Sequence, residues 1–420
     1  MSEFSDDLKR LIGSTNSEDG GNTFNPDDLR QPLEANSSEQ KDDQASIKSL
    51  KDLINQVTRK SLQTSKAEED SGLAENIPFP FLAIIGQTEM KLALLLALIN
   101  PAMGGVLLIG PRGTGKTTAV RGLLNLLPLV PRSLCRYGCL PEDIEAQGID
   151  GVCPECAKKY GEGKPLAVLD QARLVEIPLN ARLEDVIGGI DARAAIHQRL
   201  ALQRGILAQA DRNVLYVDEV NLLEDDIINA LLDAAAQGSY TVRRGPISAT
   251  YRSRFILIGS MNPEEGILRP QIQDRFGLRV IVRGLVNEND RLEAYRRVQA
   301  YFVNPRKVFL QYQTETEIAR QEIQAARELL SDVELPSKVA RWGLQLIEKI
   351  GIDSLRAEIT FFEAARTYAA IDGRKEVTIA DLKQVAPMSL RLRRSVFMND
   401  YLQQQEKEQG EFEQILNSLI

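Results

Sequence analysis

An eight-residue run rich in glycine carries the clearest chemistry in this sequence. Residues 110–117 read G-P-R-G-T-G-K-T, after an apolar segment at 105–109 and before a helical pattern. In that context the run binds nucleotide phosphates, because glycines let backbone N–H groups point inward and a helix N-terminus attracts the anion. We expect ATP with Mg²⁺, Lys116 on the β/γ-phosphates and Thr117 on the metal. The expected nucleotide contacts are Gly110, Arg112, Gly113, Thr114, Gly115, Lys116, Thr117, Thr118 and Asp218.

Two adjacent carboxylates follow an apolar segment about a hundred residues later. The segment at 213–217 leads directly into Asp218 and Glu219. Behind a phosphate-binding loop, this arrangement predicts that Asp218 holds Mg²⁺ through its water shell and that Glu219 is the general base for the attacking water. The alternative is a pair of solvated carboxylates at a strand end.

A third polar strand end is expected at Asn262, after the apolar segment 255–259. From a neighbouring strand its side chain can reach the γ-phosphate or the attacking water. The alternative is an asparagine that opens the turn before Pro263.

Two arginines are candidates for neutralising the charge that phosphoryl transfer spreads over the γ-oxygens. Arg275 lies in the string Q-D-R-F, and Arg356 lies in S-L-R within the C-terminal third. Composition does not distinguish either from surface arginines, so their assignment depends on the family pattern below.

All four cysteines lie within one short stretch. Cys135 and Cys139 are separated by three residues, and Cys153 and Cys156 by two. Two close pairs can supply four thiolates to a tetrahedral Zn²⁺. A redox-active thiol pair and inert surface thiols are the alternatives.

The elements that must position these residues alternate between strand and helix. Strand-like segments are expected at 105–109, 174–177, 213–217, 255–259 and 280–282, with helices between them, including 87–99 and 225–237. This alternation predicts an α/β fold, a parallel sheet with helices on both faces. Beyond Thr316 the pattern is helical, with Pro336, Gly351 and Gly373 dividing it into about four helices. The expected parts are a tail at 1–77, a nucleotide-binding domain at 78–285 with a cysteine-containing insertion at 133–166, a linker at 286–315, a helical lid at 316–400 and a tail at 401–420.

The N-terminal 77 residues differ from the rest in charge and composition. They hold most of the formal net charge of −8 and few bulky apolar residues, so we expect an acidic, disordered tail. Within it, Ile47, Leu50, Ile54 and Val57 are spaced for a short amphipathic helix. The remainder is close to neutral, which argues against nucleic acid as a partner. No apolar run is long enough to span a membrane, and the N-terminus resembles neither a signal nor a transit peptide, so we expect a cytoplasmic protein.

The order of these motifs resembles an AAA+ ATPase, and more specifically the ATPase (I) subunit of magnesium chelatase. The resemblance covers about residues 79–394. Its most specific strings are Y-V-D-E-V-N-L-L at 216–223, N-P-E-E-G at 262–266 and L-R-P-Q-I-Q-D-R-F-G-L at 268–278. Some positions depart from the usual family pattern, among them the segment 242–248, the pair before Asn262 and the length of the acidic tail.

The resemblance implies roles and partners. Asn262 is similar to the first sensor of the family, Arg275 to its arginine finger and Arg356 to its second sensor. The family forms hexameric rings with ATP between subunits, so Arg275 is expected to act on the ATP of a neighbour. In that family, the I subunit works with an AAA-like subunit that carries an integrin-type domain and with a porphyrin-binding subunit. The resemblance also implies an insertion at about 184–209 and a β-hairpin at about 240–251.

Three functions are therefore compared. The first is the motor that drives Mg²⁺ insertion into protoporphyrin IX in (bacterio)chlorophyll synthesis. The second is a chelatase-like remodelling ATPase that acts on another protein with an integrin-type-domain partner. The third is a nucleotide-ordered scaffold with little turnover, which the presence of Glu219, Asn262 and Arg275 disfavours.

Overall fold

The computed structural model describes residues 77–135, 137–190, 202–244 and 247–393. The acidic tail and its amphipathic segment lie outside this range, apart from Ile77, as does the C-terminal tail beyond residue 393. No helix in the described part of the chain is both long and apolar enough to cross a membrane.

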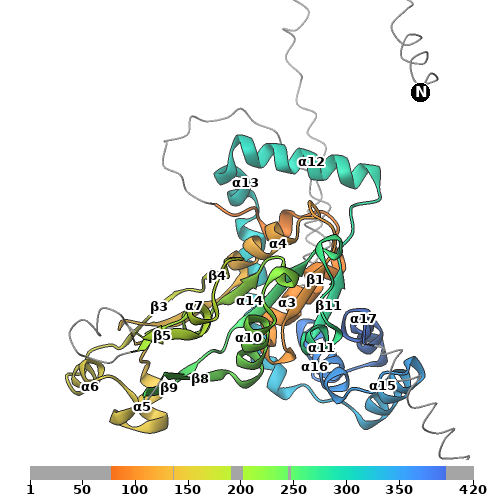
Figure 1. Cartoon of the computed structure of the whole chain (residues 1–420). Coiled ribbons are helices and arrows are strands. Elements are labelled where there is room, and N and C mark those ends of the chain that lie inside the picture. The colour runs from red at the N-terminus through yellow and green to blue at the C-terminus, as the bar shows by residue number, and fades with distance from the viewer. Residues whose placement is uncertain (1–76, 136, 191–201, 245–246, 394–420) are drawn as a thin grey trace, which may run out of the picture. The chain divides into compact units, whose positions relative to one another are not determined.

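A parallel sheet of five strands forms the centre of the nucleotide-binding domain (Figure 1). Its spatial order is β11-β1-β10-β7-β4. Each predicted strand is confirmed within a few residues of its expected ends. The strands are β1 (Val106–Ile109), β4 (Leu174–Glu176), β7 (Val214–Val217), β10 (Ile256–Met261) and β11 (Leu278–Ile281).

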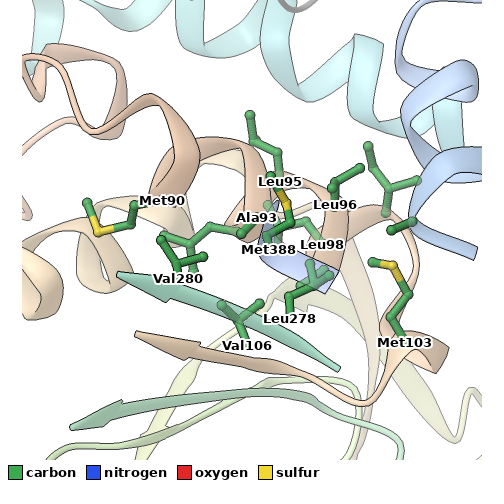
Figure 2. Packing of buried hydrophobic residues seen from close by; sticks show 14 of the residues in the cluster. Met90, Ala93, Leu95, Leu96, Leu98, Met103, Val106, Leu278, Val280 and Met388 are labelled. Atoms are coloured by element: carbon green, nitrogen blue, oxygen red, sulfur yellow. The ribbon is translucent and has the colours of Figure 1, made fainter. Parts of the chain in front are cut away.

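Alternate residues of β1, β4, β7 and β10 enter two different hydrophobic clusters, because successive side chains of a strand point to opposite faces. Val106 and Leu108 of β1 join the cluster that contains α3, α4 and the helical domain. Leu107 and Ile109 join the cluster that contains α7, α9 and α10. Figure 2 shows the first of these faces, where Ala93 and Leu98 of α3 lie over Val106 and Leu278. The bounds are α3 (Thr88–Ile99), α4 (Lys116–Leu123), α7 (Leu183–Ile187), α9 (Ile206–Gln209), α10 (Asp225–Gln237) and α11 (Pro270–Arg275).

The helical domain packs on the same face as α3. Ala319, Ile323 and Ala326, which form one stripe of α14, are buried in the cluster with α3. Arg327 of α14 donates 3.0 Å to the Leu98 carbonyl, near the C-terminal end of α3. The four predicted helices are confirmed as α14 (Gln313–Leu329), α15 (Ser337–Ile350), α16 (Leu355–Ile371) and α17 (Ile379–Leu390).

The segment 286–315, expected as a linker, is helical over most of its length. It forms α12 (Glu288–Val303) and α13 (Pro305–Gln311), whose N-termini are capped by the side chains of Asn287 and Asn304. Within α12 the one fully buried residue is Arg297, whereas Phe302 is 77% exposed. A helix without a buried apolar stripe gives little periodic signal, which explains why the sequence did not predict it.

Among the described residues, three antiparallel strand pairs extend the domain beyond the sheet. The pair β2 (Leu129–Ser133) and β3 (Ala167–Gln171) carries the cysteine-containing insertion, with α5 (Pro141–Gln147) and α6 (Pro154–Gly161) between the strands. The expected insertion at 184–209 contains α7, the pair β5 (Gly188–Ile190) and β6 (Leu202–Arg204), and α9. The expected hairpin is β8 (Ser239–Arg244) with β9 (Ile247–Arg252), and its turn residues lie outside the described part.

Candidate nucleotide site

The glycine-rich loop follows β1 and enters α4 at Lys116. Gly113 and Gly115 have φ of 77° and 84°, a left-handed conformation that favours glycine. At Gly110 the reason for glycine is space, because a Cβ there would lie 2.1 Å from the Val282 carbonyl oxygen. The loop is thus an open curve of backbone N–H groups ahead of a helix N-terminus, which suits a phosphate group.

Lys116 lies inside this curve. Its Nζ donates to the carbonyl oxygens of Gly110 at 2.7 Å and Pro111 at 2.8 Å. Burial lowers the pKa of Lys116, and the nearby carboxylates of Asp218 and Glu219 oppose that shift without cancelling it. The amine is therefore held at the mouth of the loop, between the loop and the two acidic side chains.

Asp218 is held by hydroxyl groups from three different elements. Tyr216 donates to its Oδ1 at 2.8 Å, and Thr117 donates to its Oδ2 at 3.3 Å. Ser260 of β10 also donates to Oδ1, and its hydroxyl accepts the backbone N–H of Glu219 at 3.0 Å. Burial raises the pKa of Tyr216, so its hydroxyl stays a proton donor. The carboxylate itself is exposed, as a ligand that acts through water must be.

Glu219, the second residue after β7, has a left-handed backbone with φ of 51°. Its Oε1 accepts from Arg112 of the glycine-rich loop at 3.1 Å. Arg112 also pairs with Glu265, which follows β10. The two predicted carboxylates, Arg112 and Glu265 therefore meet at the carboxyl ends of neighbouring strands, where open α/β sheets bind ligands.

Asn262 directly follows Met261, whose carbonyl oxygen accepts the Gly110 N–H at 3.0 Å. Its side-chain Oδ1 accepts the Glu264 N–H at 3.3 Å and so caps a short helix, as the turn interpretation expects. The amide Nδ2 of the same side chain is a donor and does not take part in that bond. Both interpretations are compatible with this geometry.

A cavity of about 540 Å³ adjoins the loop beside Gly113, Gly115 and Thr118. Its wall is largely apolar and comes from segments far apart in the sequence. They are the residues before α3, the segment after β11 and the first half of α12. The sequence predicted no role at the site for these residues. The lining includes Phe79, Ile85, Gln87, Leu285 and Val298.

These groups fit ATP with Mg²⁺. The site combines a loop suited to phosphate, the amine of Lys116, and the hydroxyl of Thr117 paired with the Asp218 carboxylate. Next to them is a largely apolar cavity, of a size typical of small-molecule sites. Lys116 and the loop would hold the phosphates, and Thr117 and Asp218 would hold the metal ion. The cavity would hold the adenine base.

Arg275 and Arg356 lie at the other end of the sheet. A Cβ on Gly104, which precedes β1, would lie 3.4 Å from the Arg275 carbonyl oxygen, whereas the loop follows β1. Arg275 pairs with Asp233 of α10 at 2.9 Å. Arg356 is exposed at the start of α16 and interacts electrostatically with Arg393, which contacts Gly277 at the same end. The structure therefore does not bring either arginine to the loop of its own chain.

The four cysteines lie together within the insertion between β2 and β3. Their sulfur atoms are all within 4.8 Å of one another. The backbone N–H groups of Cys139 and Cys153 each donate 3.3 Å to a sulfur, of Cys135 and Cys139 respectively. Burial alone raises the pKa of Cys135, but hydrogen bonds from Ser133 and Cys139 lower it to about 6.

Comparison with known families identifies both domains. A family described as AAA domain matches residues 102–261, and one described as AAA lid domain matches residues 345–417.

Curated relatives match along most of the chain. The magnesium-chelatase subunit ChlI homolog of Methanocaldococcus jannaschii is 42% identical, over 80% of this chain and 92% of its own. The magnesium-chelatase 38 kDa subunit of Acidiphilium rubrum is 41% identical, over 75% of this chain and 90% of its own. Among solved structures, a complex of magnesium-chelatase subunits BchI and BchD contains a chain that is 38% identical. That match covers 76% of this chain and 97% of the other, with a TM-score of 0.44.

Removing the Tyr216 hydroxyl should weaken metal use more than nucleotide binding. Tyr216→Phe deletes one hydrogen bond to Asp218, an interaction of about 1 kcal/mol, so the Mg²⁺ concentration for half-maximal ATP hydrolysis should rise roughly fivefold. Titration of activity with Mg²⁺ at saturating ATP measures this. Tyr295→Phe is the matched control and should leave the titration unchanged, because Tyr295 is exposed and does not line the cavity. An unaltered Mg²⁺ requirement in Tyr216→Phe would remove Tyr216 from the metal site.

Proposed function

Because the chain belongs to the family of magnesium-chelatase ATPase subunits, we propose that it is the ATP-hydrolysing motor that drives Mg²⁺ insertion into protoporphyrin IX, in (bacterio)chlorophyll synthesis. The protein is an AAA ATPase and uses ATP with Mg²⁺. The Mg²⁺ inserted into the porphyrin is substrate, separate from the Mg²⁺ that accompanies ATP. A cytoplasmic location is part of the same proposal.

The observation that carries hydrolysis is the meeting of Lys116, Asp218 and Glu219 at one end of the sheet. Lys116 neutralises phosphate charge, and Asp218 with Thr117 orients the metal ion. Glu219 holds the attacking water and accepts its proton, and Arg112 keeps that carboxylate beside the loop. Asn262 orients the same water or the γ-phosphate from the neighbouring strand.

The position of the two arginines supports a shared site. Arg275 and Arg356 belong to the opposite end of the sheet from the loop, which supports a role for each at the nucleotide of an adjacent subunit. We infer a ring of identical subunits, six by analogy with the family, with ATP bound between neighbours. Family membership also supports an AAA-like partner with an integrin-type domain and a porphyrin-binding subunit.

Subunits that lack different halves of a shared site should complement one another. Glu219→Gln should keep ATP binding and lose most hydrolysis, because the amide cannot accept the proton. Arg275→Ala should lower kcat by roughly a thousandfold, the usual contribution of an arginine finger. Mixing the two variants before ATPase assay should restore part of the activity, since the intact site of one then meets the intact finger of the other.

The mixing experiment needs proof that subunits exchange. Native mass spectrometry of the mixture, with one variant carrying a mass tag, gives that proof. Exchange without any recovery of ATPase activity would contradict an intersubunit finger.

Reconstitution decides between the client molecules. The chain, combined with the porphyrin-binding and integrin-domain subunits of a chelatase, protoporphyrin IX, Mg²⁺ and ATP, should give the fluorescence of magnesium protoporphyrin. Glu219→Gln in the same mixture is the control and should give none. Undiminished ATPase activity without porphyrin metallation would instead favour the remodelling of another protein.

We also propose that Cys135, Cys139, Cys153 and Cys156 hold a structural Zn²⁺. Zinc–sulfur bonds of about 2.3 Å place tetrahedral sulfurs roughly 3.8 Å apart, so this cluster needs little adjustment to become a site. The core of the insertion is small, since the cluster of buried residues in its described part consists of two of these cysteines and Leu166. So small a core does not usually hold a fold without a metal or disulfide. The redox-pair alternative does not use all four sulfurs at once.

Metal analysis should find about one Zn per chain in protein purified without chelator. Cys156→Ser should lose the metal and expose the insertion to limited proteolysis, because a buried ligand is removed. Ser133→Ala, which removes a hydroxyl beside Cys135 but no ligand, should retain zinc. Metal-free protein with a protease-resistant insertion would refute the site.

A further inference from the structure

Arg393, just after α17, uses all of its hydrogen-bonding capacity. An arginine side chain has five N–H donors, and five bonds are present. Two go to Asp274, to its backbone oxygen at 3.2 Å and to Oδ1 at 2.8 Å. Two go to the carbonyl oxygens of Phe276 at 3.0 Å and Gly277 at 2.7 Å, and the last to the Ser389 carbonyl oxygen at 2.7 Å.

The contact is reciprocal. Arg279 of β11, in the nucleotide-binding domain, donates at 2.6 Å to the carbonyl oxygen of Leu392, next to Arg393. It also donates at 3.1 Å to the same Asp274 carboxylate. The side chain of Arg393 is fully buried and that of Arg279 is 1% exposed. We call Asp274, Arg279 and Arg393 the clasp.

The clasp binds the backbone on both sides of Arg275, the candidate arginine finger. The bonded residues Asp274 and Phe276 are the two sequence neighbours of Arg275, and Gly277 completes the turn into β11. That turn has no room to shift toward β1, because a Cβ on Gly277 would lie 1.7 Å from the Met103 carbonyl oxygen. The backbone that carries Arg275 is therefore held by the residues before β1 on one side and by the helical domain on the other.

The second candidate arginine adjoins the same contact. The pKa of Arg393 is lowered by burial first, and also by the charge of Arg356. Arg356 is the second residue of α16, and α16 packs along α17, the helix that ends just before Arg393. Arg356 therefore lies within electrostatic range of the same buried guanidinium that bonds to the residues on either side of Arg275.

We propose that Arg393 is a positioning residue for Arg275, through which the helical domain sets the position of the arginine finger. This inference rests on the proposed function, in which Arg275 acts on the ATP of a neighbouring subunit. A movement of α17 shifts Arg393 and with it the backbone on both sides of Arg275. The state of one subunit's lid therefore controls hydrolysis in the adjacent site.

Loss of the clasp should reduce turnover with little change in nucleotide binding. Arg393→Ala frees the turn that carries Arg275, and misplacement of a catalytic group by about 1 Å can cost roughly a hundredfold. We expect kcat to fall by on the order of 10- to 100-fold and KM for ATP to change less than about threefold. The kcat of Arg393→Lys should also fall, by roughly tenfold, because a lysine keeps the charge but not the planar fork of donors.

Arg391→Ala is the matched control. Arg391 belongs to the same end of the helical domain but pairs with Glu89 of α3, at 2.6 Å, away from the finger. Its turnover should stay within about twofold of the wild type, the small effect of a partly exposed ion pair. An equal loss in Arg391→Ala and Arg393→Ala would reduce the clasp to general domain docking and overturn the proposal.

Mixed rings separate positioning from misfolding. If Arg393 acts on the finger, Arg393→Ala should recover activity when mixed with Glu219→Gln and should not recover when mixed with Arg275→Ala. If ATPase activity recovers in the mixture with Arg275→Ala but not in the mixture with Glu219→Gln, the defect of Arg393→Ala lies in the ATP site of its own subunit. Recovery with neither partner, while thermal melting shows loss of fold, would assign Arg393 a purely structural role; both results overturn the proposal. The Arg275→Ala and Glu219→Gln mixture, run in parallel, tests the shared site independently.

Discussion

The position of β1 between β10 and β11 is the constraint on which the rest of this site depends. The Gly110 N–H bonds to the Met261 carbonyl oxygen, and the Val282 N–H bonds to the Ile109 carbonyl oxygen at 2.7 Å. The start of the loop is therefore fixed to both neighbouring strands, and no side chain fits at Gly110. Since parallel strands end at the same edge, this register brings the carboxylates after β7 and the asparagine after β10 to the loop without any long-range rearrangement.

The same register separates the site into two halves. Residues that directly follow a strand lie at the edge of the sheet that carries the loop. Residues that directly precede β1 and β11 lie at the opposite edge. Arg275 precedes β11, so no movement of its side chain alone brings it to its own loop. In the ring proposed above, the edge of one copy that carries Arg275 can face the loop edge of the next, which would complete the site. The helical domain, attached at the finger edge through the clasp, is then suited to report on a neighbour.

The parts that the sequence predicted are those with strong local signals. The loop pattern, the buried runs of β1 and β7, and the helical stripe of α14 each depend on a few adjacent residues, and all are present. The cysteine spacing predicted a cluster, which the structure contains, while its metal stays a prediction. Other features depend on contacts between distant segments. The cavity beside the loop combines residues before α3 with residues of α12. Tyr216 is one residue of an apolar strand in the sequence, and only the fold shows that its hydroxyl contacts Thr117. Arg393 belongs to no motif, and only the packing of α17 against β11 distinguishes it from other arginines.

A polar clasp at the domain boundary has physical consequences that an apolar contact lacks. Two buried guanidinium groups share one carboxylate, and burial lowers the pKa of Arg279 to about 10, which reflects the cost of desolvating its charge. An apolar cluster of the same volume is often equally stable or more stable, so stability alone does not account for such a group. What arginine adds is direction, because its rigid fork of donors must face particular oxygens. Apolar surfaces can slide with little penalty, whereas a guanidinium that loses its alignment leaves several buried carbonyl groups without donors. The boundary at Arg393 therefore transmits a small displacement of the helical domain instead of absorbing it, and the backbone of Arg275 is the part of the structure that receives it.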